Sequence, residues 1–147
     1  MALETILNGN FPTSLDSKGR FVFPLSLRES LGKSFYVTKG PGKFLVAYSE
    51  ERWKEISDAM ARVPADKREK LVRIIFGNAE KRTPDGQGRV VITAGLRNYA
   101  GLSQDIVICG ANNRVEIWDE ALWTQMSGEA FTPEAFRDAL VGLDLCL

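Results

Sequence analysis

The chain of 147 residues contains no histidine and only two cysteines. Histidine is the commonest general base and the commonest transition-metal ligand, so its absence counts against hydrolytic or metal-assisted chemistry. Cys109 and Cys146 lie far apart and lack the CxxC spacing of a metal or redox site, and we expect buried or incidental thiols rather than a disulfide. We expect no enzymatic activity, no metal and no cofactor.

Long apolar runs are also absent. No stretch approaches the roughly 18 consecutive apolar residues of a membrane span, and the first residues lack the basic and then apolar pattern of a signal peptide. We therefore expect a soluble, cytoplasmic protein with no membrane partner. Because 44% of the residues are apolar, the chain can bury one ordinary core, which favours one pseudo-symmetric globule over two independent domains.

Charge is balanced overall but unevenly distributed. Residues 1–82 hold 15 Lys or Arg and 10 Asp or Glu, a net charge of +5, whereas residues 83–147 hold 4 and 9, a net charge of −5. A local basic surface can therefore exist on a neutral protein, and the division favours head-to-tail contact between unlike surfaces of neighbouring subunits. The alternative is that these charged residues are simply solvated on exposed faces and bind no partner.

One motif occurs twice, as LDSKGR at residues 15–20 and as PDGQGR at residues 84–89. The two aspartates are 69 positions apart, and a Leu-Arg pair, an apolar run and a tryptophan follow each copy in the same order. Each copy of a short β-rich unit usually needs its twin to bury an apolar face. We expect a first repeat with a connecting helix at residues 1–77 and a second repeat with a C-terminal helix at residues 78–147.

Local patterns predict the elements of each repeat. Each motif is interpreted as the turn of a β-hairpin, because Asp accepts hydrogen bonds from backbone amides ahead of it and Gly tolerates a positive φ. Four residues are thus expected to shape the loops: Asp16, Gly19, Asp85 and Gly88. The expected hairpins join strands 10–15 with 20–24, 81–84 with 89–93, 35–39 with 43–48, and 106–109 with 114–118.

Helices are expected after Pro24, Ser49, Pro64, Leu96, Asp119 and Thr132, with Ser49, Asp119 and Thr132 as N-caps. In the second of them, Trp53, Ile56, Met60 and Val63 recur at helical spacing, which predicts a face that packs in the core.

Two such motifs about 70 residues apart, each followed by a short helix, a strand pair and a Trp-containing helix, closely resemble the MraZ family, bacterial regulators of the cell-division and cell-wall gene cluster. The resemblance covers almost the whole chain. It implies an α+β, mainly β fold: a duplicated double-split or swapped-hairpin β-barrel of the AbrB and MraZ type with peripheral helices. It also implies a ring-like homo-oligomer in the nucleoid that binds repeated promoter boxes of double-stranded DNA. The residues carried over as DNA-binding are Lys18, Arg20, Ser17, Gln87 and Arg89.

The residue types agree with that function. Arg can make paired hydrogen bonds to guanine, Lys can bind phosphate, and a β-ribbon fits the major groove. The sequence departs from the family pattern at Asn8, where an Arg is common, and at Thr93, where a Pro is common. Because Gln87 occupies the position that Lys18 has in the first motif, we expect the first copy to make the main contacts with the DNA bases.

Three alternatives remain open. Each motif could only tighten a turn through an internal ion pair. The chain could be a structural or protein-binding module of the same barrel family, such as a toxin-neutralising partner. An enzyme using Asp16 and Asp85 as acid and base is the weakest alternative, because nothing in these turns would push the two pKa values apart.

Overall fold

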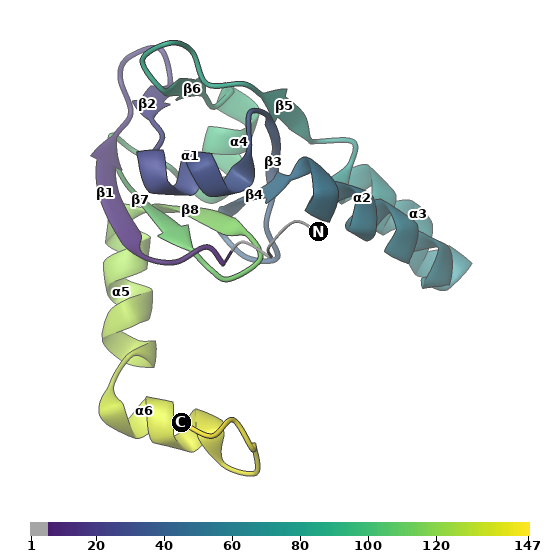
Figure 1. Cartoon of the computed structure of the whole chain (residues 1–147), viewed down its shortest axis with the longest axis vertical. Coiled ribbons are helices and arrows are strands. Elements are labelled where there is room, and N and C mark those ends of the chain that lie inside the picture. Colours follow the sequence, from purple (N-terminus) through teal and green to yellow (C-terminus); the bar gives the residue numbers. More distant parts are fainter. Residues whose placement is uncertain (1–5) are drawn as a thin grey trace.

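The computed structural model describes residues 6–147, and its elements follow the same order in the two repeats (Figure 1). The first repeat comprises β1 (Asn10–Ser14), β2 (Arg20–Val22), α1 (Leu25–Leu31), β3 (Phe35–Lys39), β4 (Leu45–Ser49), α2 (Glu50–Ala59), a 3-10 turn η1 (Met60–Arg62) and α3 (Ala65–Ile75). The second comprises β5 (Glu80–Arg82), β6 (Arg89–Val91), α4 (Ala94–Ala100), β7 (Asp105–Gly110), β8 (Val115–Asp119), α5 (Glu120–Ala130) and α6 (Pro133–Leu140).

The strands form two antiparallel sheets in which the repeats are intertwined. The larger sheet has the order β1-β7-β8-β4-β3-β5, and the smaller one pairs β2 with β6. The first strand of each repeat therefore lies beside a strand of the other repeat: β1 pairs with β7, and β5 pairs with β3. The expected α+β class, a two-repeat barrel-type fold with peripheral helices, is confirmed.

The prediction of a hairpin at each motif is wrong, because β1 does not pair with β2 and β5 does not pair with β6. The chain does reverse at each motif, since the amide of Asp16 donates to the carbonyl of Arg20 (2.8 Å) and that of Asp85 to the carbonyl of Arg89 (3.1 Å). Beyond this single bond the strands separate and each joins the other repeat. Turn chemistry specifies a reversal but not the strand that each arm joins, which depends on burial of the apolar faces.

The other two hairpins and most helix starts are confirmed. Strand β3 pairs with β4, and β7 pairs with β8 through a bend in which Asn112 has a φ of +69°. The hydroxyls of Ser49 and Thr132 cap α2 and α6 by accepting from amides three residues ahead, both at 3.1 Å. Asp119 occupies the N-cap position of α5, but its Oδ1 accepts hydrogen bonds from the amide and hydroxyl of Ser103 (2.9 and 2.6 Å), tying α5 to the loop after α4.

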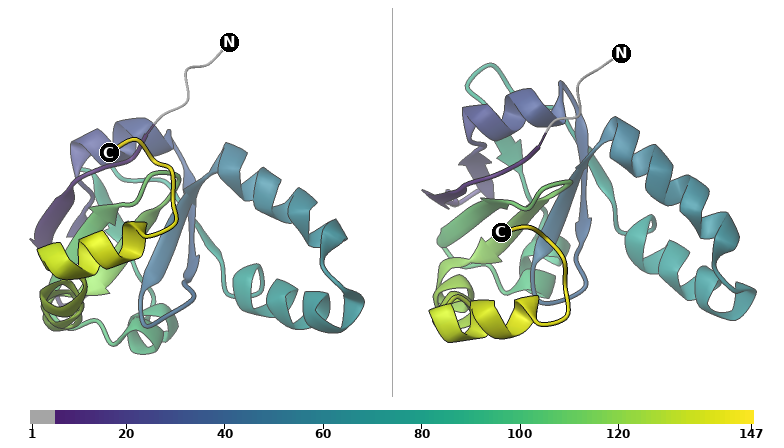
Figure 2. Two further views of the ribbon diagram at one scale, coloured as in Figure 1. Left: turned by 90° about the horizontal axis from the view of Figure 1, so that it is seen from below. Right: turned by 60° about the horizontal axis from the view of Figure 1, so that its bottom comes forward.

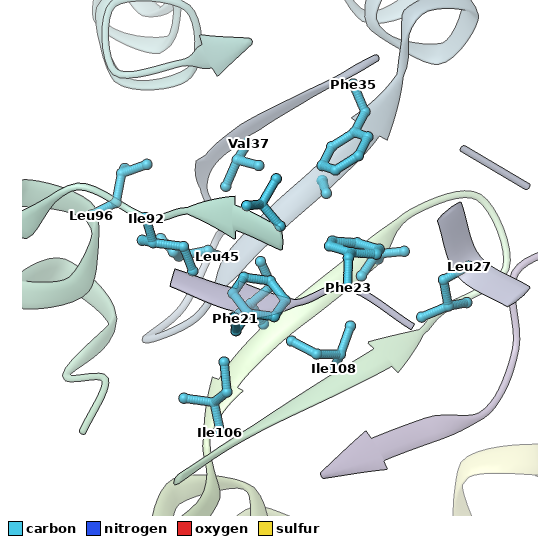
Figure 3. Packing of buried hydrophobic residues seen from close by; sticks show 14 of the residues in the cluster. Phe21, Phe23, Leu27, Phe35, Val37, Leu45, Ile92, Leu96, Ile106 and Ile108 are labelled. Carbon is cyan, nitrogen blue, oxygen red and sulfur yellow. The ribbon is translucent and has the colours of Figure 1, made fainter. Parts of the chain in front are cut away.

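One apolar core lies between the two sheets and helices α1 and α4 (Figure 3). The rings of Phe21, Phe23 and Phe35 pack in series at tilted angles, with centroids 5.6 and 4.9 Å apart. Both repeats supply the largest fully buried side chains: Phe23, Phe35, Leu27, Leu45, Ile92, Ile106, Ile108 and Ile117. Neither repeat can close this core alone, because β2 covers it only in partnership with β6.

The remaining helices project outside the barrel. Helices α2 and α3 form a hairpin on one side, and α5 and α6 form a bent arm that leaves in another direction (Figures 1 and 2). None of the four contains a buried residue, so the expectation that α2 packs in the core is wrong. Trp53 instead lies half-buried against the rings of Tyr36 and Phe76, with centroids 4.8 and 4.6 Å away.

We expect Phe23→Ala to lower the free energy of unfolding by about 3–5 kcal/mol, because it empties a fully buried site between the two repeats. The neighbouring Val22→Ala is the matched control: Val22 is 52% exposed, and its loss should cost roughly 0.5 kcal/mol or less. Urea titrations of the two variants measure both values. Equal destabilisation by the two changes would contradict the shared core.

Candidate nucleic-acid interface

Both motif loops have the same hydrogen-bond geometry. In the first loop, Asp16 Oδ1 accepts from the amides of Lys18 and Arg20, each at 2.9 Å, and Oδ2 accepts from Arg20 Nε at 2.8 Å. The second loop repeats this arrangement, with Asp85 accepting from Gln87 and Arg89 at the same distances. Each aspartate thus binds two backbone amides and one arginine side chain of its own loop.

The ion pair within each motif leaves part of the arginine unused. Arg20 and Arg89 are bound to the aspartates through Nε, and their side chains are 32% and 36% exposed to solvent. Among residues 6–147, no hydrogen bond engages the Nη atoms of either guanidinium. The aspartate therefore holds the guanidinium in one orientation while its outer edge can still donate two hydrogen bonds to a partner.

Ser17, Lys18 and Gln87 are exposed at the loop tips. The loops themselves lie side by side, at the top of the view in Figure 1. The amide of Phe23 donates to the carbonyl of Gly88, and the amide of Ile92 donates to the carbonyl of Gly19, both at 2.9 Å. Because these bonds continue the β2–β6 pairing, the DNA-binding candidates of both repeats are brought to one end of the molecule.

Each motif glycine is buried against an arginine of the other repeat. Gly19 (φ +76°) lies against the guanidinium of Arg97 from α4, and Gly88 (φ +77°) lies against that of Arg28 from α1. A Cβ at Gly88 would come within 2.7 Å of Arg28 Cζ. At both positions the backbone is left-handed and an arginine lies where a Cβ would be. Only glycine is compatible with both conditions.

Arg28 and Arg97 are functional candidates that the motif alone did not indicate. Arg28 Nε donates to the carbonyl of Phe23 at 3.0 Å, and Arg97 Nη1 donates to the carbonyl of Ile92. No ion pair within residues 6–147 includes either side chain. The signal in the sequence was their position, since each follows the arginine of its motif by eight residues. That spacing marked the duplication but did not show that each arginine supports the loop of the other repeat.

Hydrogen bonding lowers the pKa of both loop aspartates. The amide of Arg20 is the main cause for Asp16, against an opposing effect of burial. For Asp85, the amide and then the side chain of Arg89 lower the pKa from its ordinary value of 3.8 to about 2. Both carboxylates are therefore charged at neutral pH. A charged carboxylate can bind an arginine, but it has no proton to donate as a general acid.

Toward the described residues, the side chains of Asn8 and the two cysteines make only long hydrogen bonds, to residues close in the sequence. Asn8 Nδ2 donates only a long hydrogen bond, 3.4 Å, to the carbonyl of Ile6. Cys109 and Cys146 are free thiols. Within the described part of the chain, no cluster of three Cys, Asp or Glu side chains could hold a metal ion, and no helix is long and apolar enough to cross a membrane.

Two intertwined repeats with matched Asp–Arg loops at one end define a pseudo-symmetric two-repeat barrel protein. The model of one protein family, described as "MraZ protein, putative antitoxin-like", matches this chain twice, over residues 6–72 and 75–141. The Transcriptional regulator MraZ of Acetivibrio thermocellus is 39% identical over 123 residues, which are 82% of this chain and 86% of that protein. The chain belongs to the MraZ family, and it is a transcriptional regulator rather than an enzyme.

We expect Gly88→Ala to lower the free energy of unfolding by about 1–3 kcal/mol, since it combines a strained φ with a clash against Arg28. Gly86→Ala in the same loop is the matched control, because its Cβ would meet nothing within 4 Å. Thermal unfolding of both variants measures the difference. If Gly86→Ala were as damaging as Gly88→Ala, the contact between the repeats would not be what holds the loop.

The pH dependence of the second loop follows from the depressed pKa of Asp85. A carboxyl with a lowered pKa stabilises the folded state above its ordinary pKa, and this contribution is lost as the pH falls toward the folded value. We expect the contribution of Asp85 to be complete above about pH 5 and lost between about pH 4 and pH 2. A carboxyl ¹³C titration should give a midpoint near 2, and a midpoint at 3.8 would show that the hydrogen bonds do not form in solution.

Proposed function

We propose that this regulator binds double-stranded DNA in a sequence-specific manner, with Lys18, Ser17, Arg20, Gln87 and Arg89 as the contacting residues. The observation that carries the proposal is the pair of loops at one end of the barrel, each with an arginine that an aspartate orients. An oriented guanidinium with a free outer edge suits the O6 and N7 atoms of guanine in the major groove. Exposed Lys18 suits a phosphate or the same base edge.

The two loops contribute unequally in this proposal. The first has Lys18 at the position where the second has Gln87, and only the first therefore adds a positive charge at its tip. Glutamine suits adenine or makes no base contact. The first repeat, residues 1–77, then dominates recognition, and the second, residues 78–147, extends it along the groove.

Repeated DNA boxes and a ring-like homo-oligomer complete the proposal. A single pair of loops covers less surface than tight specific binding requires, whereas several copies on one assembly raise the effective concentration of each contact. The uneven charge of the two halves supports association of unlike surfaces. The regulated genes in this proposal are the cell-division and cell-wall cluster, and the protein acts in the cytoplasm at the nucleoid.

A second candidate function is that of a toxin-neutralising, protein-binding module. The family description includes the word "antitoxin-like", and a toxin-neutralising module would form a stable stoichiometric complex with another protein in the absence of DNA. Such a complex, formed equally well by a variant with Arg20→Ala, would favour that function over DNA recognition.

We expect Arg20→Ala to weaken binding to repeated boxes upstream of the regulated genes by roughly 5- to 150-fold, which corresponds to about 1–3 kcal/mol for one bidentate base contact. Arg89→Ala should have a smaller effect. The slope of log affinity against log salt should be clearly negative for the wild type, because phosphate contacts release counterions. Fluorescence anisotropy at several salt concentrations measures both quantities.

Lys54→Ala is the control for charge, because this exposed residue belongs to α2, a helix that lies outside the barrel and apart from the motif loops. It should bind as the wild type does. A wild type that does not distinguish the boxes from scrambled duplex, and that Arg20→Ala leaves unchanged, would refute the proposed function.

A further inference from the structure

The two strands of the small sheet expose one face to solvent between the motif loops. We call this surface the ribbon face and define it as Arg20 and Val22 of β2 with Arg89 and Val91 of β6. Residues directly opposite each other in an antiparallel pair lie on the same face, and here Arg20 lies opposite Val91 while Val22 lies opposite Arg89. The middle residue of each strand lies on the other face and is buried in the core. Each repeat thus contributes one arginine and one valine to the ribbon face.

The two valines form an exposed apolar centre on this face. Val22 is 52% exposed and Val91 is 41% exposed, and the register places them diagonally across the ribbon, each opposite a motif arginine. Strand propensity favours β-branched residues, polar threonine among them, so it does not by itself account for two apolar side chains here. Their exposure has a free-energy cost that is recovered when contact with another apolar group removes them from water.

The ribbon face joins the two motif loops into one surface. At one end the carbonyl of Gly19 accepts from the amide of Ile92, and at the other the carbonyl of Gly88 accepts from the amide of Phe23. The four residue steps from Gly19 to Phe23 correspond to about 13 Å of strand, and a major groove is about 12 Å wide and admits a two-stranded ribbon. A duplex that contacts both loops therefore passes over the two valines.

The chemistry of the major groove indicates what an apolar centre can contact there. The base edges present hydrogen-bond donors and acceptors, and the C5 methyl group of thymine is the apolar feature in this pattern. A contact with phosphate alone would leave the valines without an apolar partner. Of the groups that mark sequence in the groove, the thymine methyl is thus the one that complements Val22 and Val91.

We infer that Val22 and Val91 contact thymine methyl groups, so that the protein distinguishes thymine as well as guanine. Arg20 and Val22 are two residues apart on one strand, about 7 Å, which is the rise of about two base pairs. The contacted thymines therefore lie within about two base pairs of the guanines that the arginines bind. This inference rests on the proposed DNA binding and adds two specificity-determining residues to it.

The test replaces the thymines of one box, one at a time, by deoxyuridine, which removes the C5 methyl group and keeps the base pairing. At each contacted position this change should weaken binding of the wild type roughly 3- to 5-fold, as expected for one methyl group that leaves water on binding. Val22→Ser should weaken binding to the unmodified box by a similar factor and should lose the sensitivity to uracil at one position. Val91→Ser should lose it at a second position. Fluorescence anisotropy, analysed as double-mutant cycles, measures the coupling.

Val72→Ser is the matched control, because it makes the same chemical change at an exposed valine of α3, outside the barrel. It should bind the box and discriminate against uracil as the wild type does. Circular dichroism of all three variants checks that each is folded, and the measurement of the wild type on the uracil duplexes depends on no variant.

Two results would overturn the inference and leave the proposed function intact. One is a wild type that binds the boxes specifically and tolerates uracil at every thymine position. The other is full retention of the uracil sensitivity in both Val22→Ser and Val91→Ser. A wild type that binds the boxes and scrambled duplex equally well would instead overturn the proposed DNA recognition, and this inference with it.

Discussion

Strands β2 and β6 pair across the two repeats, and the amides of Phe23 and Ile92 extend this pairing to the carbonyls of Gly88 and Gly19. The pairing covers the core, because Phe21 of β2 and Val90 of β6 are buried in it. It also places the two motif loops next to each other. Arg28 and Arg97 then fill the space beneath the loop of the opposite repeat. Stability and the arrangement of the candidate interface thus share one cause.

The internal Asp–Arg ion pair and the proposed DNA recognition are compatible roles of one motif. Asp16 uses one oxygen for backbone amides and the other for Arg20 Nε, which fixes the loop and the guanidinium together. An exposed ion pair contributes little stability by itself. For the proposed recognition, its effect would be that a guanidinium already held in place loses less conformational entropy on binding.

Local chemistry made much of the fold predictable. Ser49 and Thr132 correctly predicted the starts of two helices, and the Gly-Pro-Gly sequence at residues 40–42 predicted the turn between β3 and β4. The repeated motif identified the candidate loops. Strand partners were not predictable from the residues, since a turn at Asp16 is equally compatible with a closed hairpin and with two strands that separate; only the family resemblance implied the swap. The contacts of Arg28 and Arg97 and the direction of α6 depend on tertiary packing that no local pattern encodes.

Native-state hydrogen exchange tests the cross-repeat pairing most directly. The account expects the amides of residues 20–23 and 89–92 to exchange through one cooperative opening, so that low concentrations of denaturant reduce their protection in parallel. The amides of Phe23 and Ile92 should show the same opening free energy. An opening that exposes one of these segments while the other stays protected would mean that each repeat holds its own loop, and it would contradict the account.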